Sequence, residues 1–214
     1  MSDLVLYNYF RSSTSYRARI ALHWKELSFQ YRPVHLLNNG GEQHSAEYRK
    51  LNPTGEVPTL IHNGFTIGQS MAIIQYLDEV FPEKPLFPKN PGLKAQVLQF
   101  CENINCTHPY QNLKTIQFLE KNFKITPEQK NQWIQNWLDQ CFISLESSLK
   151  NQSGKFCFGD NLTAADAFLI PQLFSAQRFQ VPIDNYPLIQ KIQKNCLEQE
   201  AIQKAHPTNQ IDSE

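Results

Sequence analysis

The sequence predicts an α+β protein built from two parts, a mixed β/α domain followed by an all-helical domain. Up to about Phe81, short runs rich in β-branched and aromatic residues alternate with stretches in which apolar residues recur at helical spacing. From Phe81 to Pro91 the chain carries four prolines and almost no hydrophobic period. Beyond Pro91 the hydrophobic pattern is helical. We therefore expect domains at 1–83 and 91–214, joined by a proline-rich linker at 84–90.

The elements of the first domain follow the order strand, helix, strand, helix, strand, strand, helix. His62-Asn63-Gly64 separates the last two strands, and Asn-Gly tolerates the positive φ that a tight hairpin turn requires. This order matches that of a thioredoxin-like domain. The expected elements are a strand at 4–10, a helix at 15–26, a strand near 28–34, a looser helical segment at 44–50, strands near 58–62 and 65–67, and a helix at 70–80.

The second domain is predicted to contain helices alone. Thr126-Pro127-Glu128 is a typical helix start, because proline is tolerated in the first turn. Thr163-Ala164-Ala165-Asp166 is typical of a capping box, in which the acid reaches back to the N–H of the capping residue, and we interpret it as structural. The chain from His206 onward is polar, and we expect it to be mobile. Helices are expected at 91–122, 127–149, 163–180 and 186–202.

The composition favours small-molecule chemistry. The chain has 214 residues, a formal net charge of +0 and 19% charged residues, so it lacks the basic surface that nucleic acids or anionic membranes require. No apolar stretch approaches the ~20 residues of a membrane span, and the first residues do not have the pattern of a signal peptide. We expect a soluble protein of the cytoplasm, with neither nucleic acid nor membrane as a partner.

The five cysteines are odd in number and scattered, which is typical of reduced core residues. Cys101, Cys106 and His108 lie close together in the sequence. No second pair of ligands lies nearby, however, and no H-E-x-x-H pattern is present. We therefore predict no metal site.

A cluster of hydroxyl residues stands where the first predicted strand gives way to the first predicted helix. Ser12-Ser13-Thr14 comes directly before the helical pattern that begins at Ser15. The unpaired N–H groups and the positive dipole end of a helix stabilise an anion, and a serine hydroxyl can donate one more hydrogen bond. For a single serine, plain N-capping would be the better explanation. Three consecutive hydroxyl residues followed by Arg17-Ala18-Arg19 favour a functional site that would suit a thiolate.

This motif resembles the Ser-Ser-Cys-x-(Trp/Tyr)-Arg-x-Arg signature of zeta-class glutathione transferases, the maleylacetoacetate isomerases. It differs at one point, because Thr14 stands where the family has cysteine. The resemblance implies a thioredoxin-like domain followed by an all-α domain, glutathione as the cofactor and a homodimer. It continues in family order along the whole chain, in Asn52–Leu60, Gln69–Leu77, His108–Leu113, Gly159–Asp166, Ile170–Gln172 and Arg178-Phe179.

The resemblance assigns catalysis to Ser12, Ser13 and Thr14. It implies that Ser12 and the helix start stabilise the glutathione thiolate, although the sequence leaves open which of the two serines activates the thiol. An unperturbed cysteine thiol has a pKa near ~8.5, so fixed donors are needed to ionise it at neutral pH. A threonine hydroxyl cannot form the mixed disulfide that the family's cysteine forms, and we therefore do not expect reductive dehalogenation.

The resemblance also implies the residues that hold glutathione. It implies a cis bond before Pro58, which would present the backbone of Val57 to the extended tripeptide, and it places the γ-glutamyl end at Gln69 and Ser70. Without the neighbouring motifs, a strand-opening proline and a plain N-cap would explain these positions. Gln43 matches the region that holds the glycyl end, although an exposed glutamine in a loop is more often simply solvated.

His108 and Asn112 are expected on the first helix of the second domain, four residues apart and therefore on one face. In the family this stretch faces glutathione. A pair of ordinary helix-surface residues is the alternative.

Arginines are the candidate clamps for a dicarboxylate substrate, since a guanidinium holds a carboxylate by two parallel hydrogen bonds. Arg178 matches the family's substrate-site arginine, and Arg11 stands beside the serines. Arg17 and Arg19 point to different helix faces, so at most one of them can face the pocket. The other is expected to make a structural ion pair.

The reaction implied is the glutathione-dependent cis–trans isomerisation of maleylacetoacetate, in tyrosine and phenylalanine breakdown. Maleylpyruvate is an alternative substrate, because both compounds are cis-enediones with carboxylates. In addition, a threonine at position 14 resembles the pattern of relatives that isomerise maleylpyruvate. Outside the enzymes, the alternative is a glutathione-fold binding protein without chemistry. The presence of Ser12, Ser13, Gln69 and Ser70 argues against it.

Overall fold

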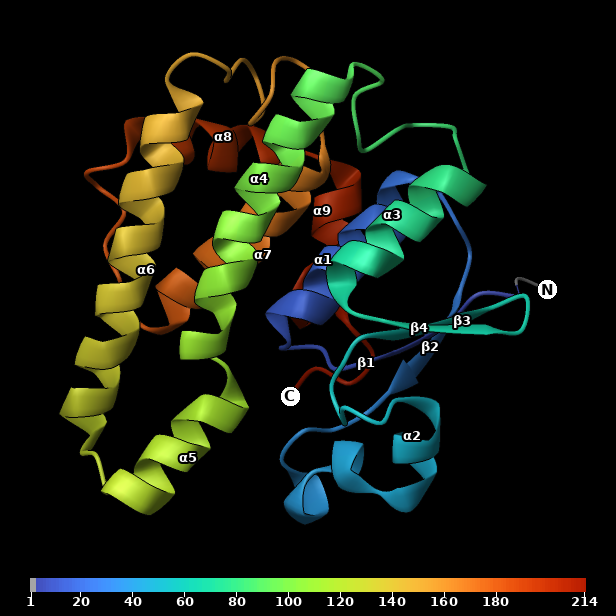
Figure 1. The fold of residues 1–214 in the computed structure, drawn as a ribbon, viewed down its shortest axis with the longest axis vertical. Coiled ribbons are helices and arrows are strands. Elements are labelled where there is room, and N and C mark those ends of the chain that lie inside the picture. Colours follow the sequence, from blue (N-terminus) through green and yellow to red (C-terminus); the bar gives the residue numbers. More distant parts are fainter. Residues whose placement is uncertain (1–2) are drawn as a thin grey trace. The chain divides into compact units, whose positions relative to one another are not determined.

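The computed structural model describes residues 3–214, which divide into two compact units (Figure 1). One unit combines the chain up to Leu86 with Leu197–Glu214, and the helical unit is Phe87–Cys196. The sequence-based division differs here, because it assigns the whole C-terminal segment to the helical domain. The difference arises from α9 (Glu200–Ala205), which packs against α1 (Ser13–Trp24) and buries its apolar side chains in the N-terminal unit.

The N-terminal unit is centred on a four-stranded mixed sheet with the strand order β2-β1-β3-β4. β1 pairs in parallel with β2 and antiparallel with β3, and β3 and β4 form a hairpin. Asn63 and Gly64 both have positive φ at the hairpin turn, as predicted. The predicted order of elements is confirmed: β1 (Val5–Asn8), α1, β2 (Gln30–Pro33), α2 (Ala46–Leu51), β3 (Thr59–His62), β4 (Phe65–Gly68) and α3 (Ser70–Val80).

Within this unit, α1 and α3 pack against each other on one side of the sheet, and α2 lies on the other side (Figure 1). β1 is shorter than its apolar run predicts. The N–H of Ser12 donates to the carbonyl of Tyr9 at 3.1 Å and closes a turn, and α1 begins directly afterwards at Ser13. The short strand and the early helix therefore place the hydroxyl cluster at the helix start.

The helical unit contains one helix break that the sequence analysis does not predict. The expected helix at 91–122 is interrupted after Thr107, passes through a 3₁₀ turn at His108–Tyr110 and resumes at Leu113. Pro109 accounts for the break, because its ring has no N–H and clashes with the carbonyl four residues earlier. The helices of this unit are α4 (Pro91–Thr107), α5 (Leu113–Phe123), α6 (Pro127–Leu149), α7 (Ala164–Arg178) and α8 (Pro187–Leu197).

The expected helix at 186–202 is also divided, into α8 and α9. The two helices bury their apolar faces in different units, α8 through Ile189 and Ile192 and α9 through Ala201 and Ile202. A single straight helix would present one continuous apolar face to one core. The chain divides into α8 and α9 because their apolar residues belong to the cores of two different units.

The predicted helix starts are confirmed. Thr126 and Gln129 form a capping box at α6, with bonds of 3.3 and 2.8 Å. At α7 the carboxylate of Asp166 is fully buried and accepts from the N–H of Thr163 and the N–H of Cys157, both at 2.8 Å. Burial raises the pKa of Asp166, against the lowering effect of these hydrogen bonds.

The expectation of a mobile tail from His206 onward is wrong. Pro207–Asn209 forms a 3₁₀ turn with Pro207 buried, and Asp212 accepts hydrogen bonds from Phe10 and Tyr31 of the N-terminal unit. The polar tail is ordered because its carboxylates find donors there.

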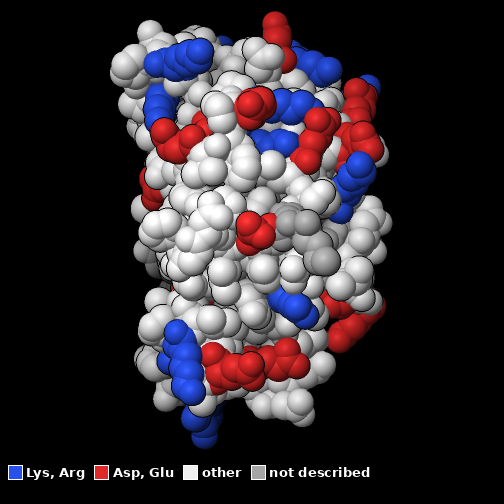
Figure 2. Space-filling model, turned by 90° about the vertical axis from the view of Figure 1, so that its right-hand side faces the viewer, with Lys and Arg blue, Asp and Glu red and all other residues white. Residues whose placement is uncertain are grey.

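On the face shown in Figure 2, acidic and basic side chains are interspersed, with no basic track. Within residues 3–214, no helix combines the length and the apolar character that crossing a membrane requires.

Candidate active site

The hydroxyl cluster forms a connected chain of hydrogen bonds at the start of α1. Ser12 is the N-cap, and its Oγ accepts from the N–H of Ser15 at 3.2 Å. Ser12 Oγ and Thr14 Oγ1 lie 2.9 Å apart, and the Thr14 hydroxyl donates to the carbonyl of Val57 at 2.8 Å. Since Thr14 has one hydroxyl proton and gives it to Val57, Ser12 is the donor between the two hydroxyls. Ser13 is buried at 8% exposure, whereas Ser12 and Thr14 are half-buried.

Val57 lies beside this cluster on the segment that leads into β3. The Val57-Pro58 peptide bond is cis, as the family resemblance implies. The preceding carbonyl, that of Glu56, accepts from the hydroxyl of Tyr48 at 2.7 Å and from the side-chain amide of Asn52 at 2.9 Å. A carbonyl oxygen has two lone pairs, so the Val57 carbonyl can accept a second donor while Thr14 occupies the first.

At the start of α3 a buried arginine lies beside a buried serine hydroxyl. Ser70 is 3% exposed, and its Oγ accepts from Nη1 of the fully buried Arg17 at 3.4 Å. Gln69 is the N-cap of α3 with φ +65°, and its side-chain amide donates to Glu56 at 3.3 Å. Non-glycine residues at positive φ are uncommon and cluster at functional sites. Arg17 and the N-terminal N–H groups of α3 therefore suit a carboxylate.

Gln43 lies in the 3₁₀ turn Glu42–His44 and is buried at 6% exposure, so it is not a solvated loop residue. Its Nε2 donates to the carbonyl of Leu36 at 3.3 Å, whereas its Oε1 has no hydrogen-bond partner among the described residues. Gly41 has φ +100°, and a Cβ there would meet the Gln43 amide at 2.5 Å. Glycine is therefore required for this packing.

Arg19 is fully buried, and the expected ion pair is wrong for this residue. Burial lowers the pKa of Arg19 to about 10, so the side chain stays protonated at neutral pH. Its guanidinium donates to the carbonyls of Phe10 (2.8 Å), Tyr9 (3.2 Å) and Ala205 (3.0 Å) and to Oδ1 of Asn8 (2.9 Å). Arg19 therefore ties the β1–α1 loop to the end of α9.

Arg11 is half-buried at the end of the β1–α1 loop. Its Nη2 donates to the hydroxyl of Tyr9 at 3.4 Å, and its guanidinium lies 5.6 Å from the ring centre of Phe10. These contacts hold a positive charge one residue away from Ser12.

The helical unit carries the remaining predicted site residues. His108 opens the 3₁₀ turn, and Asn112 is the N-cap of α5, where its Oδ1 accepts from the N–H of Thr115 at 2.8 Å. The prediction that His108 and Asn112 share one helix face is wrong, because Pro109 ends the helix between them. Arg178 is the exposed last residue of α7, with its guanidinium 5.0 Å from the ring centre of Phe179.

Comparison with known families covers both units. Residues 6–85 match the model of the glutathione S-transferase N-terminal domain, and residues 107–205 match that of the C-terminal domain. The chain belongs to the glutathione S-transferase family. The zeta-class resemblance is confirmed by relatives such as the maleylacetoacetate isomerase of Rattus norvegicus, which is 40% identical over 98% of this chain and 94% of its own length.

Solved structures agree with this placement. A bacterial zeta-class maleyl pyruvate isomerase superposes with a TM-score of 0.94 at 35% identity, covering 98% of this chain and 100% of the other. A maleylacetoacetate isomerase from Anaeromyxobacter dehalogenans 2CP-1, with bound glutathione, gives a TM-score of 0.88 at 34% identity, covering 99% and 98%. These neighbours confirm the fold class predicted for this glutathione S-transferase.

The sequence analysis does not predict several polar groups of this glutathione S-transferase site. Glu56 and Tyr48 are among them, although Glu56 belongs to a motif that carries the family resemblance. Asp212 is another, and it stands in a polar tail with no pattern that marks it.

The five cysteines are free, and four of them are buried. Burial raises the pKa values of the Cys157 and Cys196 thiols, with a further contribution from Asp166, so these thiols are poor nucleophiles. Among residues 3–214, the structure brings together no group of three or more side chains suited to hold a metal ion.

Proposed function

We propose that this glutathione S-transferase is a glutathione-dependent cis–trans isomerase of maleylacetoacetate. The observation that carries the proposal is the chain from Ser12 to Thr14 to the Val57 carbonyl, because it joins a hydroxyl donor at a helix start to backbone that suits an extended peptide. The names of the zeta-class relatives support the same reaction.

Glutathione binds along the N-terminal unit in this proposal. Its cysteinyl backbone pairs with Val57, and its γ-glutamyl carboxylate is held by Gln69, Ser70 and the N-terminus of α3, with Arg17 adding positive charge. The orphaned Oε1 of Gln43 supports a role at the glycyl end, because a buried acceptor gains most from a new N–H donor. His108 and Asn112 contribute further glutathione contacts from the helical unit.

Ser12 activates the thiol in this proposal. Its hydroxyl turns from Thr14 to the sulfur, and the N-terminus of α1 adds its dipole, so that the thiolate is stabilised at neutral pH. Thr14 keeps its bond to Val57 and holds the cluster in place. Ser13 is the weaker candidate because it is the more buried of the two serines.

The thiolate then adds to the double bond of the cis-enedione. A sulfur–carbon bond forms at the carbon remote from the ketone, and the π electrons move onto the ketone oxygen as an enolate. The former double bond, now a single bond, rotates. The enolate electrons then re-form the double bond, the sulfur–carbon bond breaks, and the thiolate departs, so that the trans product has the same composition as the substrate. Arg11 and Arg178 hold the substrate carboxylates and the enolate charge.

The test is conversion of maleylacetoacetate by the purified protein with and without glutathione. We expect a rapid absorbance change with glutathione and none above the uncatalysed rate without it. Equal rates under both conditions would overturn the proposal. Binding of glutathione without turnover would favour a non-catalytic binding protein.

Maleylpyruvate is the second candidate substrate, favoured by Thr14 and by the close structural likeness to a maleyl pyruvate isomerase. A parallel assay decides between the two, because the better substrate has the higher kcat/KM.

We also propose a homodimer of the cytoplasm. The five free cysteines suit a reducing compartment. Light scattering of the purified protein tests the dimer, and cell fractionation tests the location.

A further inference from the structure

The last residues of the chain reach the two loops that carry the proposed glutathione site. Asp212 is bonded on both carboxylate oxygens: Oδ2 accepts from the N–H of Phe10 at 3.1 Å, and Oδ1 accepts from the hydroxyl of Tyr31. Burial raises the pKa of Tyr31, so its hydroxyl remains a donor. Phe10 stands two residues before Ser12, in the loop between β1 and α1.

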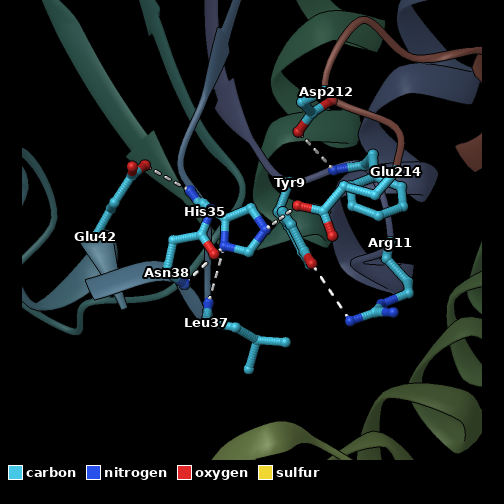
Figure 3. A network of polar contacts seen from close by, with 9 residues as sticks. Tyr9, Arg11, His35, Leu37, Asn38, Glu42, Asp212 and Glu214 are labelled. Atoms are coloured by element: carbon cyan, nitrogen blue, oxygen red, sulfur yellow. Dashed lines mark hydrogen bonds and ion pairs between the residues drawn. The ribbon is translucent and has the colours of Figure 1, made fainter. Parts of the chain in front are cut away.

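Glu214 makes a second connection, through His35 (Figure 3). Nδ1 of His35 accepts from the N–H groups of Leu37 (3.2 Å) and Asn38 (2.8 Å), so the ring proton is on Nε2. That nitrogen lies 3.0 Å from Oε1 of Glu214 and donates to it. The N–H of His35 donates to Glu42 at 2.7 Å, which closes the loop directly before Gln43.

Phe10 is clamped from two directions. Its carbonyl accepts from the buried guanidinium of Arg19, and its N–H donates to Asp212. Because both partners lie outside the loop, the peptide group after Phe10 is fixed to α1 and the peptide group before it is fixed to the C-terminal tail. Phe10 is 6% exposed, so removing the acceptor would leave its N–H in a place where water is a poor substitute.

We infer that Asp212 and Glu214 are positioning residues of the glutathione site: Asp212 fixes the loop that carries Arg11 and Ser12, and Glu214 fixes the loop that leads to Gln43. The inference rests on the proposed function in one respect, that glutathione binds at these loops. Neither carboxylate touches glutathione in this account. Each acts through a loop, so its loss weakens binding without removing a binding group.

The experiment uses Asp212→Ala and Glu214→Ala in the full-length protein. Ser213→Ala is the matched control, since it changes the residue between them. Calorimetry gives the glutathione Kd, and hydrogen exchange reports the backbone amides at Phe10 and at Leu37 and Asn38. We expect Asp212→Ala to raise the Kd about 10-fold and to speed exchange at Phe10, and Glu214→Ala to speed exchange at Leu37 and Asn38 with a smaller rise in Kd.

The conservative variants separate positioning from general destabilisation. Asp212→Asn and Glu214→Gln each keep an acceptor oxygen, so both should recover most of the lost affinity. If the alanine variants bind glutathione as the wild type does, or if melting temperature falls while loop exchange stays unchanged, the inference is overturned. If the wild type itself does not bind glutathione, the proposed function fails instead, and faster exchange in the alanine variants still shows that the tail holds the loops.

Discussion

The two units bury polar groups for different purposes. In the N-terminal unit the fully buried Arg17 and Arg19 donate to groups in loops and at a helix start, so buried charge fixes the places where the chain is irregular. In the helical unit the fully buried Asp166 caps α7, the buried Gln111 donates to the buried Gln172 at 2.9 Å, and most of the remaining core is apolar. The core of that unit includes Val97, Phe100, Ile104, Ile134, Leu138, Phe142, Leu145, Leu169 and Ile170.

Because the buried polar groups of the two units have different partners, substitutions in the two units should affect stability and activity differently. Burying a charge costs free energy unless hydrogen bonds replace its hydration, so each buried charge has to be matched by donors or acceptors. Arg19 is matched by carbonyls of the loop that leads to Ser12, whereas Asp166 is matched by the N–H of Thr163, the N-cap of α7, and by the N–H of Cys157 in the segment before α7. Changes at Asp166 should therefore act on folding, and changes around Ser12 should act on the reaction.

The largest effect is expected from Asp166→Ala. The variant leaves two buried N–H donors without an acceptor, and we expect it to lower the free energy of unfolding by about 3 kcal/mol. Chemical denaturation measures this loss, with the exposed Asp184→Ala as the control. Activity per folded molecule should stay at the wild-type level. A loss of activity without a loss of stability would contradict the division between the units.

Ser12→Ala tests the other side of the comparison. It deletes the donor to the thiolate, and we expect glutathione-dependent isomerisation to fall roughly 10²-fold or more, as when one donor of an anion hole is removed. Steady-state kinetics measure the loss, and thermal unfolding should shift by a few degrees at most. Ser13→Ala should have a smaller effect. If Ser13→Ala abolished activity while Ser12→Ala retained it, the two roles would have to be exchanged.

Arg178→Ala asks whether the helical unit also takes part in recognition. If the guanidinium binds a substrate carboxylate, kcat/KM should fall, mainly because KM rises. The fall corresponds to a loss of about 1.5–3 kcal/mol of transition-state stabilisation. Glutathione affinity should hardly change, and Arg178→Lys should recover only part of the loss, because an ammonium lacks the planar fork. A neutral electrophile should react at nearly the wild-type rate. Equal losses for all substrates would make Arg178 a structural residue.

The sequence predicts the N-terminal unit well because its signals are local. Alternating apolar runs and the Asn63-Gly64 turn specify the order of its elements. The sequence does not predict the break at Pro109, because the helical period continues on both sides of the proline. The contacts of Arg19 with Ala205 and of Asp212 with Phe10 join residues far apart in the chain, and no local pattern encodes them. The sequence predicts the hydroxyl cluster, whereas the bond from Thr14 to Val57 depends on the fold, which brings together residues 43 positions apart.

The smallest expected effect concerns His23, which lies on α1 and packs against Phe29 with ring centres 5.5 Å apart. Burial, followed by the positive charges of Lys204 and Arg19, lowers the pKa of His23 to about 4. In the unfolded chain the value is near ~6.5, so between these limits the unfolded state binds a proton that the folded state does not.

Stability should therefore be unaffected by His23 above pH ~6.5 and should decline as the pH falls towards 4, because protonation favours the unfolded chain. His23 is partly exposed, so solvent screening limits its share to about 1 kcal/mol. Urea unfolding of the wild type and of His23→Gln across this range measures that share, and the variant should lose less stability on acidification. Parallel curves would mean that His23 does not titrate differently in the two states, and that the acid sensitivity of the N-terminal unit comes from other groups.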